Sequence, residues 1–258
     1  MRTSELFDLG GRVAIVTGGG TGIGRQLAQG LAELGADLVL CARKAERCEQ
    51  AAAELRDELG VRALGLRCNV ADPDEVQAVV DRTVAELGRI DILVNNAGTT
   101  WGAPPEEMPL AGWQKVLDVN LTGAFLCAQS AGRHMIAAGE GGRIVNIASV
   151  AGLGGASAEV IDTIVYHASK GGLIAFTRDL AWKWARHGIT VNAIAPGWFP
   201  SDMSGYVLDR AGEALLASIP LRRYGGEDDL KGAVAYLASR ASAYVTGQVL
   251  VVDGGQTA

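Results

Sequence analysis

The sequence predicts an α/β protein in which a doubly wound parallel sheet of about seven strands is covered by helices on both faces. Short apolar, β-rich runs alternate with alanine- and leucine-rich helical patterns along the chain, and a glycine-rich turn joins the first run to the first helical pattern. The chain has no internal repeat and no linker long enough to divide it. We therefore expect one domain that spans residues 1–258.

The expected strands are short runs of Val, Ile, Leu and Ala. They are Val13–Val16, Leu38–Cys41, Ala63–Arg67, Ile92–Val94, Ile144–Ile147, Val191–Ala195 and Val249–Val252. Helical patterns such as Ala45–Leu59 and Pro73–Leu87 separate them, as a parallel sheet requires. The segment Pro200–Tyr224 breaks this alternation, and we expect residues 199–224 to form a lid over a substrate.

Composition excludes several functions. The formal net charge is −6 and no stripe of Lys and Arg offsets it, which argues against a nucleic-acid partner. The N-terminus lacks the apolar core of a signal peptide, and no apolar run reaches membrane-spanning length, so a cytoplasmic protein without a membrane partner is expected. The four cysteines lack CxxC spacing and are expected to be reduced, and the three scattered histidines predict no metal site.

The glycine-rich turn follows the first strand directly and precedes a helical pattern, as in the first unit of a Rossmann-like fold. Glycines allow the backbone to turn tightly and to approach a pyrophosphate, whose charge the helix N-terminus stabilises. The residues expected to hold this part of a dinucleotide are Gly18, Gly20, Thr21, Gly22, Ile23 and Gly24.

Tyr166 and Lys170 are separated by one helical turn, so their side chains share a helix face. A free tyrosine titrates near about 10, and a neighbouring ammonium group lowers that pKa toward the range useful for proton transfer. The same spacing also occurs in amphipathic helices whose Tyr packs and whose Lys is solvated, so this pair by itself leaves both interpretations open.

Together these motifs resemble the short-chain dehydrogenase/reductase family, and the resemblance covers nearly the whole chain. The matching motifs, in family order, are TGxxxGxG at Thr17–Gly24, NNAG at Asn95–Gly98, Asn120, Ser149, Tyr166 with Lys170, and Pro196-Gly197. The family performs hydride transfer between a nicotinamide cofactor and a ketone or secondary alcohol, and that activity is what the resemblance implies here.

The resemblance implies catalytic roles for four residues. Tyr166 is the acid in reduction and the base in oxidation, and Lys170 lowers the Tyr166 pKa and holds the nicotinamide ribose. Ser149 donates to the substrate oxygen, and Asn120 holds a water that links Lys170 to solvent. The alternatives are a strand-end cap for Ser149 and a helix-interior polar group for Asn120. Relatives often have a shorter segment between Ser149 and Tyr166, so Gly154–Thr163 is expected to form a loop at the pocket mouth.

The second strand ends without the acidic residue that would bind the adenosine ribose and repel a 2′-phosphate. Arg43 and Lys44 follow it instead, and both suit a phosphate group. We therefore predict NADP(H). NAD(H) remains the alternative, because Thr21 stands where many NADP-preferring relatives have a basic residue, and because Arg43 and Lys44 could be a solvated pair.

Further cofactor contacts follow from the resemblance. They are Asn69 and Val70 at the adenine, Asn96, Ala97 and Gly98 at the adenosine ribose, and Pro196, Gly197 and Ser201 at the nicotinamide, beside Tyr166 and Lys170. Asn95 is expected to bridge the central strands instead of binding a ligand.

Ser149 and Tyr166 are expected to contact the substrate, and Trp101 and Trp198 lie on loops expected at the same end of the sheet. The closest motif resemblance is to 3-oxoacyl reductases of the rhamnolipid-pathway type and to gluconate 5-dehydrogenase-like enzymes. We favour a 3-oxoacyl or related carbonyl reductase over the sugar-acid alternative. The intact set of Asn120, Ser149, Tyr166 and Lys170 argues against a non-catalytic NADP(H)-binding protein. A structural assembly protein does not explain Tyr and Lys at this spacing.

Arg222 and Arg223 are expected either to contact an acidic group of the substrate or to be ordinary surface charges. Relatives usually form homotetramers through two long helices and the C-terminal strand. The corresponding segments here are Leu110–Ala138, Val165–His187 and Val249–Asp253.

Overall fold

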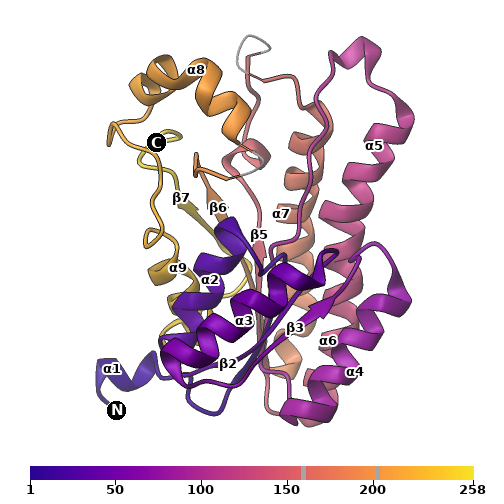
Figure 1. Ribbon diagram of the computed structural model, residues 1–258, viewed down its shortest axis with the longest axis vertical. Coiled ribbons are helices and arrows are strands. Elements are labelled where there is room, and N and C mark those ends of the chain that lie inside the picture. Colours follow the sequence, from indigo (N-terminus) through magenta and orange to yellow (C-terminus); the bar gives the residue numbers. More distant parts are fainter. Residues whose placement is uncertain (158–160, 202–203) are drawn as a thin grey trace.

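The computed structural model describes residues 1–157, 161–201 and 204–258. It confirms the predicted fold class: one seven-stranded, all-parallel sheet has the strand order β3-β2-β1-β4-β5-β6-β7 (Figure 1). Each predicted strand is present, with ends shifted by at most two residues. The strands are β1 (Val13–Thr17), β2 (Asp37–Ala42), β3 (Ala63–Arg67), β4 (Ile92–Asn95), β5 (Gly142–Ile147), β6 (Ile189–Pro196) and β7 (Val249–Val252).

The α-helices connect the strands, and two predicted helices have the bounds that the sequence indicated. The helices are α1 (Thr3–Leu6), α2 (Gly22–Ala32), α3 (Ala45–Leu59), α4 (Pro73–Leu87), α5 (Leu110–Leu117), α6 (Gly123–Ala138), α7 (Ile164–Trp184), α8 (Gly205–Ser218) and α9 (Lys231–Ala238). Helix α4 shows why the bounds of such a helix can be predicted from the sequence. The Asp72 carboxylate accepts from two backbone N–H groups, Pro73 begins the helix, and Gly88 ends it in the left-handed conformation.

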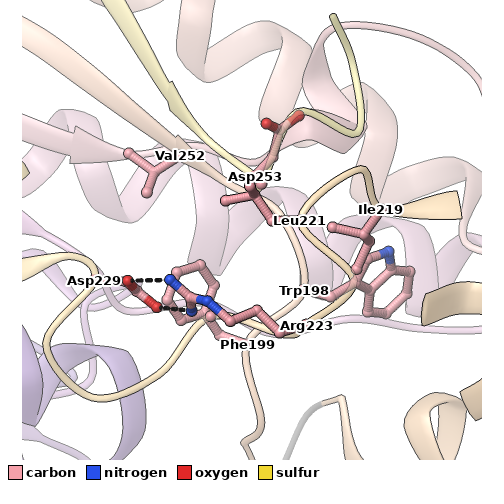
Figure 2. A pocket seen from close by; sticks show the side chains of 10 residues that line it. Trp198, Phe199, Ile219, Leu221, Arg223, Asp229, Val252 and Asp253 are labelled. Carbon is pink, nitrogen blue, oxygen red and sulfur yellow. Dashed lines mark hydrogen bonds and ion pairs between the residues drawn. The ribbon is translucent and has the colours of Figure 1, made fainter. Parts of the chain in front are cut away.

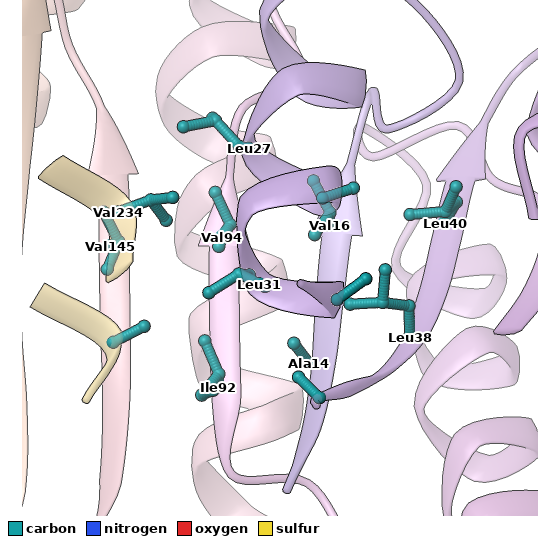
Figure 3. Packing of buried hydrophobic residues seen from close by; sticks show 14 of the residues in the cluster. Ala14, Val16, Leu27, Leu31, Leu38, Leu40, Ile92, Val94, Val145 and Val234 are labelled. Atoms are coloured by element: carbon teal, nitrogen blue, oxygen red, sulfur yellow. The ribbon is translucent and has the colours of Figure 1, made fainter. Parts of the chain in front are cut away.

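Helices cover both faces of the sheet (Figure 1). On one face, α2, α3 and α9 pack against the sheet, and Leu27 and Leu31 of α2 lie over Val16 and Val94 (Figure 3). On the other face, side chains of α4, α6 and α7 form a second core. Each fully buried Leu contributes about 1.5–3 kcal/mol to folding.

The expected long helix Leu110–Ala138 is helical throughout but is not one regular α-helix. The structure inserts a π-helical segment, η2 (Asp118–Thr122), between α5 and α6. A π-helical turn adds one residue to the ordinary helical repeat, and such turns are frequent at functional sites. The apolar pattern on both sides is continuous, so it gave no sign of this insertion.

The expected lid contains α8, and the loop expected at Gly154–Thr163 follows the short helix η3 (Val150–Gly152). Part of each lies outside the described residues, namely 202–203 and 158–160. Within the described ranges, no helix is both long and apolar enough to cross a membrane.

Candidate active site

Strand order reverses direction between β1 and β4, and the carboxyl ends of the strands border a cleft of about 980 Å³ there. The structure brings together along this cleft all the residues that the sequence assigned to the cofactor. They are Gly18, Gly20, Thr21, Gly22, Ile23, Gly24, Arg43, Lys44, Asn69, Val70, Asn96, Ala97, Gly98, Tyr166, Lys170, Pro196, Gly197 and Ser201.

The glycine turn is shaped by a close approach between two of its residues. Gly18 has φ +66°, which only glycine adopts readily, and its carbonyl oxygen would lie 2.1 Å from a Cβ placed on Gly24. Side chains are therefore excluded where a pyrophosphate would meet the start of α2. Both the cleft and this backbone cradle fit a dinucleotide.

Polar contacts hold the turn against the start of the NNAG motif. The Asn96 side chain donates to the carbonyl oxygens of Thr17 (2.9 Å) and Gly18 (3.2 Å), and the Thr17 hydroxyl accepts from the backbone N–H groups of Asn96 and Ala97. Asn96 thus positions the turn. Asn95 does bridge the central strands as expected, since its amide donates to Asn146 on β5.

Three basic residues line the end of the cleft nearest β2: Arg43, Lys44 and Arg47. Sequence reasoning missed Arg47. It follows Lys44 by three residues, and Lys44 is the N-cap of α3, so helical spacing from that cap could have indicated it.

At the other end of the cleft, the Lys170 ammonium lies over the ring of Tyr166, 5.6 Å from the ring centroid. It donates to the Ile147 carbonyl oxygen at 2.6 Å, and Lys170 is only 4% exposed. Burial lowers the pKa of Lys170 to about 8.

The expected lowering of the Tyr166 pKa is not found for the protein chain by itself. Burial raises the pKa of Tyr166 above its ordinary value, and a hydrogen bond with Ser149 opposes this in part. The physical reason is orientation: the Lys170 ammonium faces the ring and bonds Ile147, so it gives the phenolic oxygen no hydrogen bond.

Ser149 combines the two roles that the sequence left open. Its hydroxyl oxygen caps η3 by accepting from the Ala151 backbone N–H at 3.1 Å, and the same hydroxyl is hydrogen-bonded to Tyr166. The cap therefore fixes the Ser149 side chain beside the phenol, where both face the cleft.

Asn120 lies in the π-helical segment and is 1% exposed. Its side chain accepts from the Thr99 backbone N–H (2.8 Å) and donates to the Thr99 carbonyl (2.9 Å) and to the Ser169 hydroxyl (3.0 Å). A Cβ on Gly98 would lie within 4 Å of both Asn120 Oδ1 and Lys170 Nζ. Asn120 therefore ties the NNAG loop to α7, next to Lys170.

The structure does not bring the two predicted tryptophans to this cleft. Trp101 packs on Gly112 of α5, beneath the ammonium of Lys115. Trp198 lines a separate cavity of about 100 Å³, with Phe199 beside it (Figure 2).

The two arginines of uncertain role have partners inside the protein. Arg223 forms a two-pronged ion pair with Asp229 across that smaller cavity (Figure 2), and Arg222 donates to the Ala217 carbonyl oxygen. Of the two alternatives weighed for this pair, ordinary surface charges are therefore the better supported, here with partners in the same chain.

Comparison with known proteins agrees with this geometry. A family model described as enoyl-(acyl carrier protein) reductase matches residues 18–257. The chain is 41% identical to 2-dehydro-3-deoxy-D-gluconate 5-dehydrogenase of Escherichia coli, with 97% of each chain covered. It is 42% identical to the rhamnolipid-biosynthesis 3-oxoacyl-(acyl-carrier-protein) reductase of Pseudomonas aeruginosa, which covers 96% of this chain and 97% of that one.

Among solved structures, a gluconate 5-dehydrogenase from Burkholderia cenocepacia in complex with NADP and tartrate superposes with a TM-score of 0.93. That protein is 41% identical over 99% of both chains. With these matches across its full length, the chain is a member of the short-chain dehydrogenase/reductase family, an oxidoreductase that acts on CH–OH groups with a nicotinamide cofactor.

Proposed function

We propose that this protein is an NADP(H)-dependent reductase that transfers a hydride to a ketone, with 3-oxoacyl thioesters or related carbonyl compounds as substrates. One observation carries the proposal: a single cleft joins the basic group Arg43, Lys44 and Arg47 to the hydrogen-bonded pair Ser149 and Tyr166. A cofactor anchored at the first end can place its reactive ring at the second.

The mechanism assigns each proton and charge to a side chain. When bound, NADPH supplies the hydride. Tyr166 donates its phenolic proton to the carbonyl oxygen of the ketone, and Ser149 donates a hydrogen bond to the same oxygen as negative charge develops there. Lys170, whose ammonium lies over the Tyr166 ring, stabilises the phenolate that remains. In the oxidative direction, Tyr166 accepts the proton.

The preference for NADP(H) rests on charge at the end of β2. Arg43 provides a planar guanidinium for a 2′-phosphate, and Lys44 and Arg47 line the cleft beside it. The solved relative that holds NADP, at 41% identity, supports this cofactor.

The preference for an acyl substrate rests on exposed apolar side chains that are close in sequence to the catalytic pair. Leu153 and Ile164 are 44% and 42% exposed, and they lie close in sequence to Ser149 and Tyr166 respectively. Arg222 and Arg223 already have hydrogen-bond partners in the chain, so they are poorly placed to bind a carboxylate of the substrate. These features favour an apolar chain over an acidic sugar.

A sugar-acid dehydrogenase is the second candidate, because a relative of that class is as similar in sequence as the 3-oxoacyl reductase is. The test follows the absorbance of NADPH or NADH with an acetoacetyl thioester, small diketones and 5-ketogluconate. NADPH oxidation with the thioester supports the first candidate. Preference for 5-ketogluconate selects the second, and preference for NADH contradicts the proposed role of Arg43.

We further propose a cytoplasmic homotetramer whose lid at residues 199–224 covers the substrate. Leu110 of α5, Phe125 of α6 and Trp182 of α7 are large exposed apolar side chains, which suit burial against another copy. Light scattering after size exclusion would contradict the tetramer by returning the mass of a monomer.

A further inference from the structure

Two cysteines lie next to each other at the end of the sheet where the cleft opens. Ala42 of β2 is the register partner of Arg67 of β3, so Cys41 precedes this pair on one strand and Cys68 follows it on the other. Side chains alternate between sheet faces, which places both thiols on the same face. They belong to one core cluster, and each thiol shifts the pKa of the other.

Both cysteines are buried, with 1% of Cys41 and 2% of Cys68 exposed, and Cys68 is the one that borders the cleft. Cys68 lines it together with Asn69, Val70 and the basic residues Arg43 and Lys44, whereas Cys41 is enclosed by the core. A small oxidant in the cleft therefore meets Cys68 first. Its surroundings favour reaction, because Cys41 lowers the pKa of the Cys68 thiol and thiolates are the nucleophilic form.

We propose that Cys41 and Cys68 form a peroxide-sensitive thiol pair whose disulfide weakens cofactor binding. The proposal relies on the proposed function only in taking this cleft as the cofactor site. The Cys68 thiolate attacks one peroxide oxygen, which breaks the O–O bond, leaves Cys68 as a sulfenic acid and releases hydroxide. Cys41 sulfur then attacks the Cys68 sulfur, and water leaves. The two thiols lose two electrons in total, and hydrogen peroxide becomes two waters.

Disulfide geometry connects this reaction to the cofactor. In a regular sheet, strand spacing and rise place such diagonal neighbours roughly 8 Å apart between Cα atoms. A disulfide holds its Cα atoms about 4.4–6.8 Å apart. Bond formation therefore draws Cys68 toward β2 and shifts Asn69 and Val70, the residues assigned to the adenine. Displacing one polar contact and its apolar neighbour corresponds to about a tenfold loss of affinity.

The experiment treats the full-length protein with hydrogen peroxide, with and without saturating NADP⁺, and maps cross-linked peptides by mass spectrometry after free thiols are blocked. We expect a Cys41–Cys68 disulfide that bound NADP⁺ suppresses and dithiothreitol removes. We also expect oxidation to weaken NADPH binding about tenfold, measured by fluorescence titration. Absence of this cross-link in the protein without NADP⁺ overturns the proposal.

Two variants sharpen the test. Cys41→Ala should stop oxidation at the Cys68 sulfenic acid, which dimedone traps, and should form no disulfide. Cys127→Ala removes a thiol of the same core that does not line the cleft, and it should cross-link like the unchanged protein. An equal loss of NADPH affinity on oxidation of Cys41→Ala would overturn the coupling. If Cys41→Ala does not fold, the cross-link map of the unchanged protein still decides.

The readouts keep the two proposals apart. A protein that forms the disulfide but never binds NADPH contradicts the proposed function and the coupling. A protein that binds NADPH and reduces ketones but forms no disulfide contradicts only the thiol pair.

Discussion

The Lys170 ammonium faces the ring of Tyr166 instead of its hydroxyl group, at 5.6 Å from the ring centroid. Its hydrogen bond goes to the Ile147 carbonyl oxygen at the end of β5. The cation is thus held next to the phenol by the sheet, and the phenolic oxygen is left to Ser149 and the substrate. Proton transfer and charge stabilisation are assigned to different side chains of one helix turn.

Replacing the phenolic hydroxyl tests this division. Tyr166→Phe removes the proton donor but keeps the ring, so we expect the rate of ketone reduction to fall by about 10²–10⁴-fold. NADPH affinity should change little. Tyr244→Phe is the matched control, since Tyr244 is fully exposed, and its rate should equal that of the unchanged protein. Similar turnover in Tyr166→Phe would refute the assigned acid.

Lys170 makes the stability depend on pH. Its folded pKa, about 8, is below the ordinary Lys value of 10.5, so the cost of burying the ammonium is fully present below about pH 8. That cost is relieved as pH rises toward the unfolded pKa. Between about pH 7 and about pH 9.5, this group should add about 2 kcal/mol to the free energy of unfolding of the protein without cofactor.

Urea denaturation of the unchanged protein and of Lys170→Met at both pH values measures this. The difference between them isolates Lys170, because the other titrating groups are common to both proteins. The gain should be absent from the variant. An equal gain in both would show that Lys170 titrates at its ordinary pKa.

Arg43→Ala tests whether Arg43 binds the 2′-phosphate of NADPH. Loss of a charge-assisted contact should weaken NADPH binding by about tenfold or more and leave NADH binding nearly unchanged. The control is Arg82→Ala, which removes an exposed guanidinium on α4 that pairs with Glu86, away from the cleft. Equal losses for NADPH and NADH would mean that Arg43 does not contact a 2′-phosphate.

Two glycines give opposite expectations for the same substitution. Gly24→Ala places a methyl group against the Gly18 carbonyl oxygen, so we expect lost NADPH binding and a lower melting temperature. Gly232→Ala, in α9, meets no atom within 4 Å and should raise stability by about 0.5 kcal/mol. Calorimetry and fluorescence titration on both variants check this, and normal NADPH affinity in Gly24→Ala would contradict the close approach.

The sheet could be predicted from the sequence because its strands are short apolar runs, and the central strands β1, β4 and β6 are buried on both faces. Runs such as Ala63–Arg67 and Val249–Val252 have the bounds that the sequence indicated. The cofactor cleft was predictable for a related reason: its residues follow strand ends, and parallel strands bring those ends together.

The directions in which the side chains of Trp101 and Lys170 point could not be predicted from the sequence. Trp101 sits on a loop at the correct end of the sheet, yet it packs on Gly112, a small residue that no local pattern marks as its partner. The orientation of Lys170 over the Tyr166 ring is likewise set by Ile147, more than twenty positions away. Arg47 lies within the first turn of α3, whose start was predicted correctly, so helical spacing from Lys44 would have indicated it.

The π-helical segment Asp118–Thr122 lies between α5 and α6. A π-helical turn takes up one more residue than an α-helical turn, so removing one residue there would restore an ordinary helix and leave α6 close to its present rotation about the axis. The wider turn that carries Asn120 would disappear, and the Asn120 bonds to Thr99 and Ser169 would be lost, while Cys127 and Met135 would keep their places in the core. A one-residue deletion in this stretch should therefore spare the fold and damage the site.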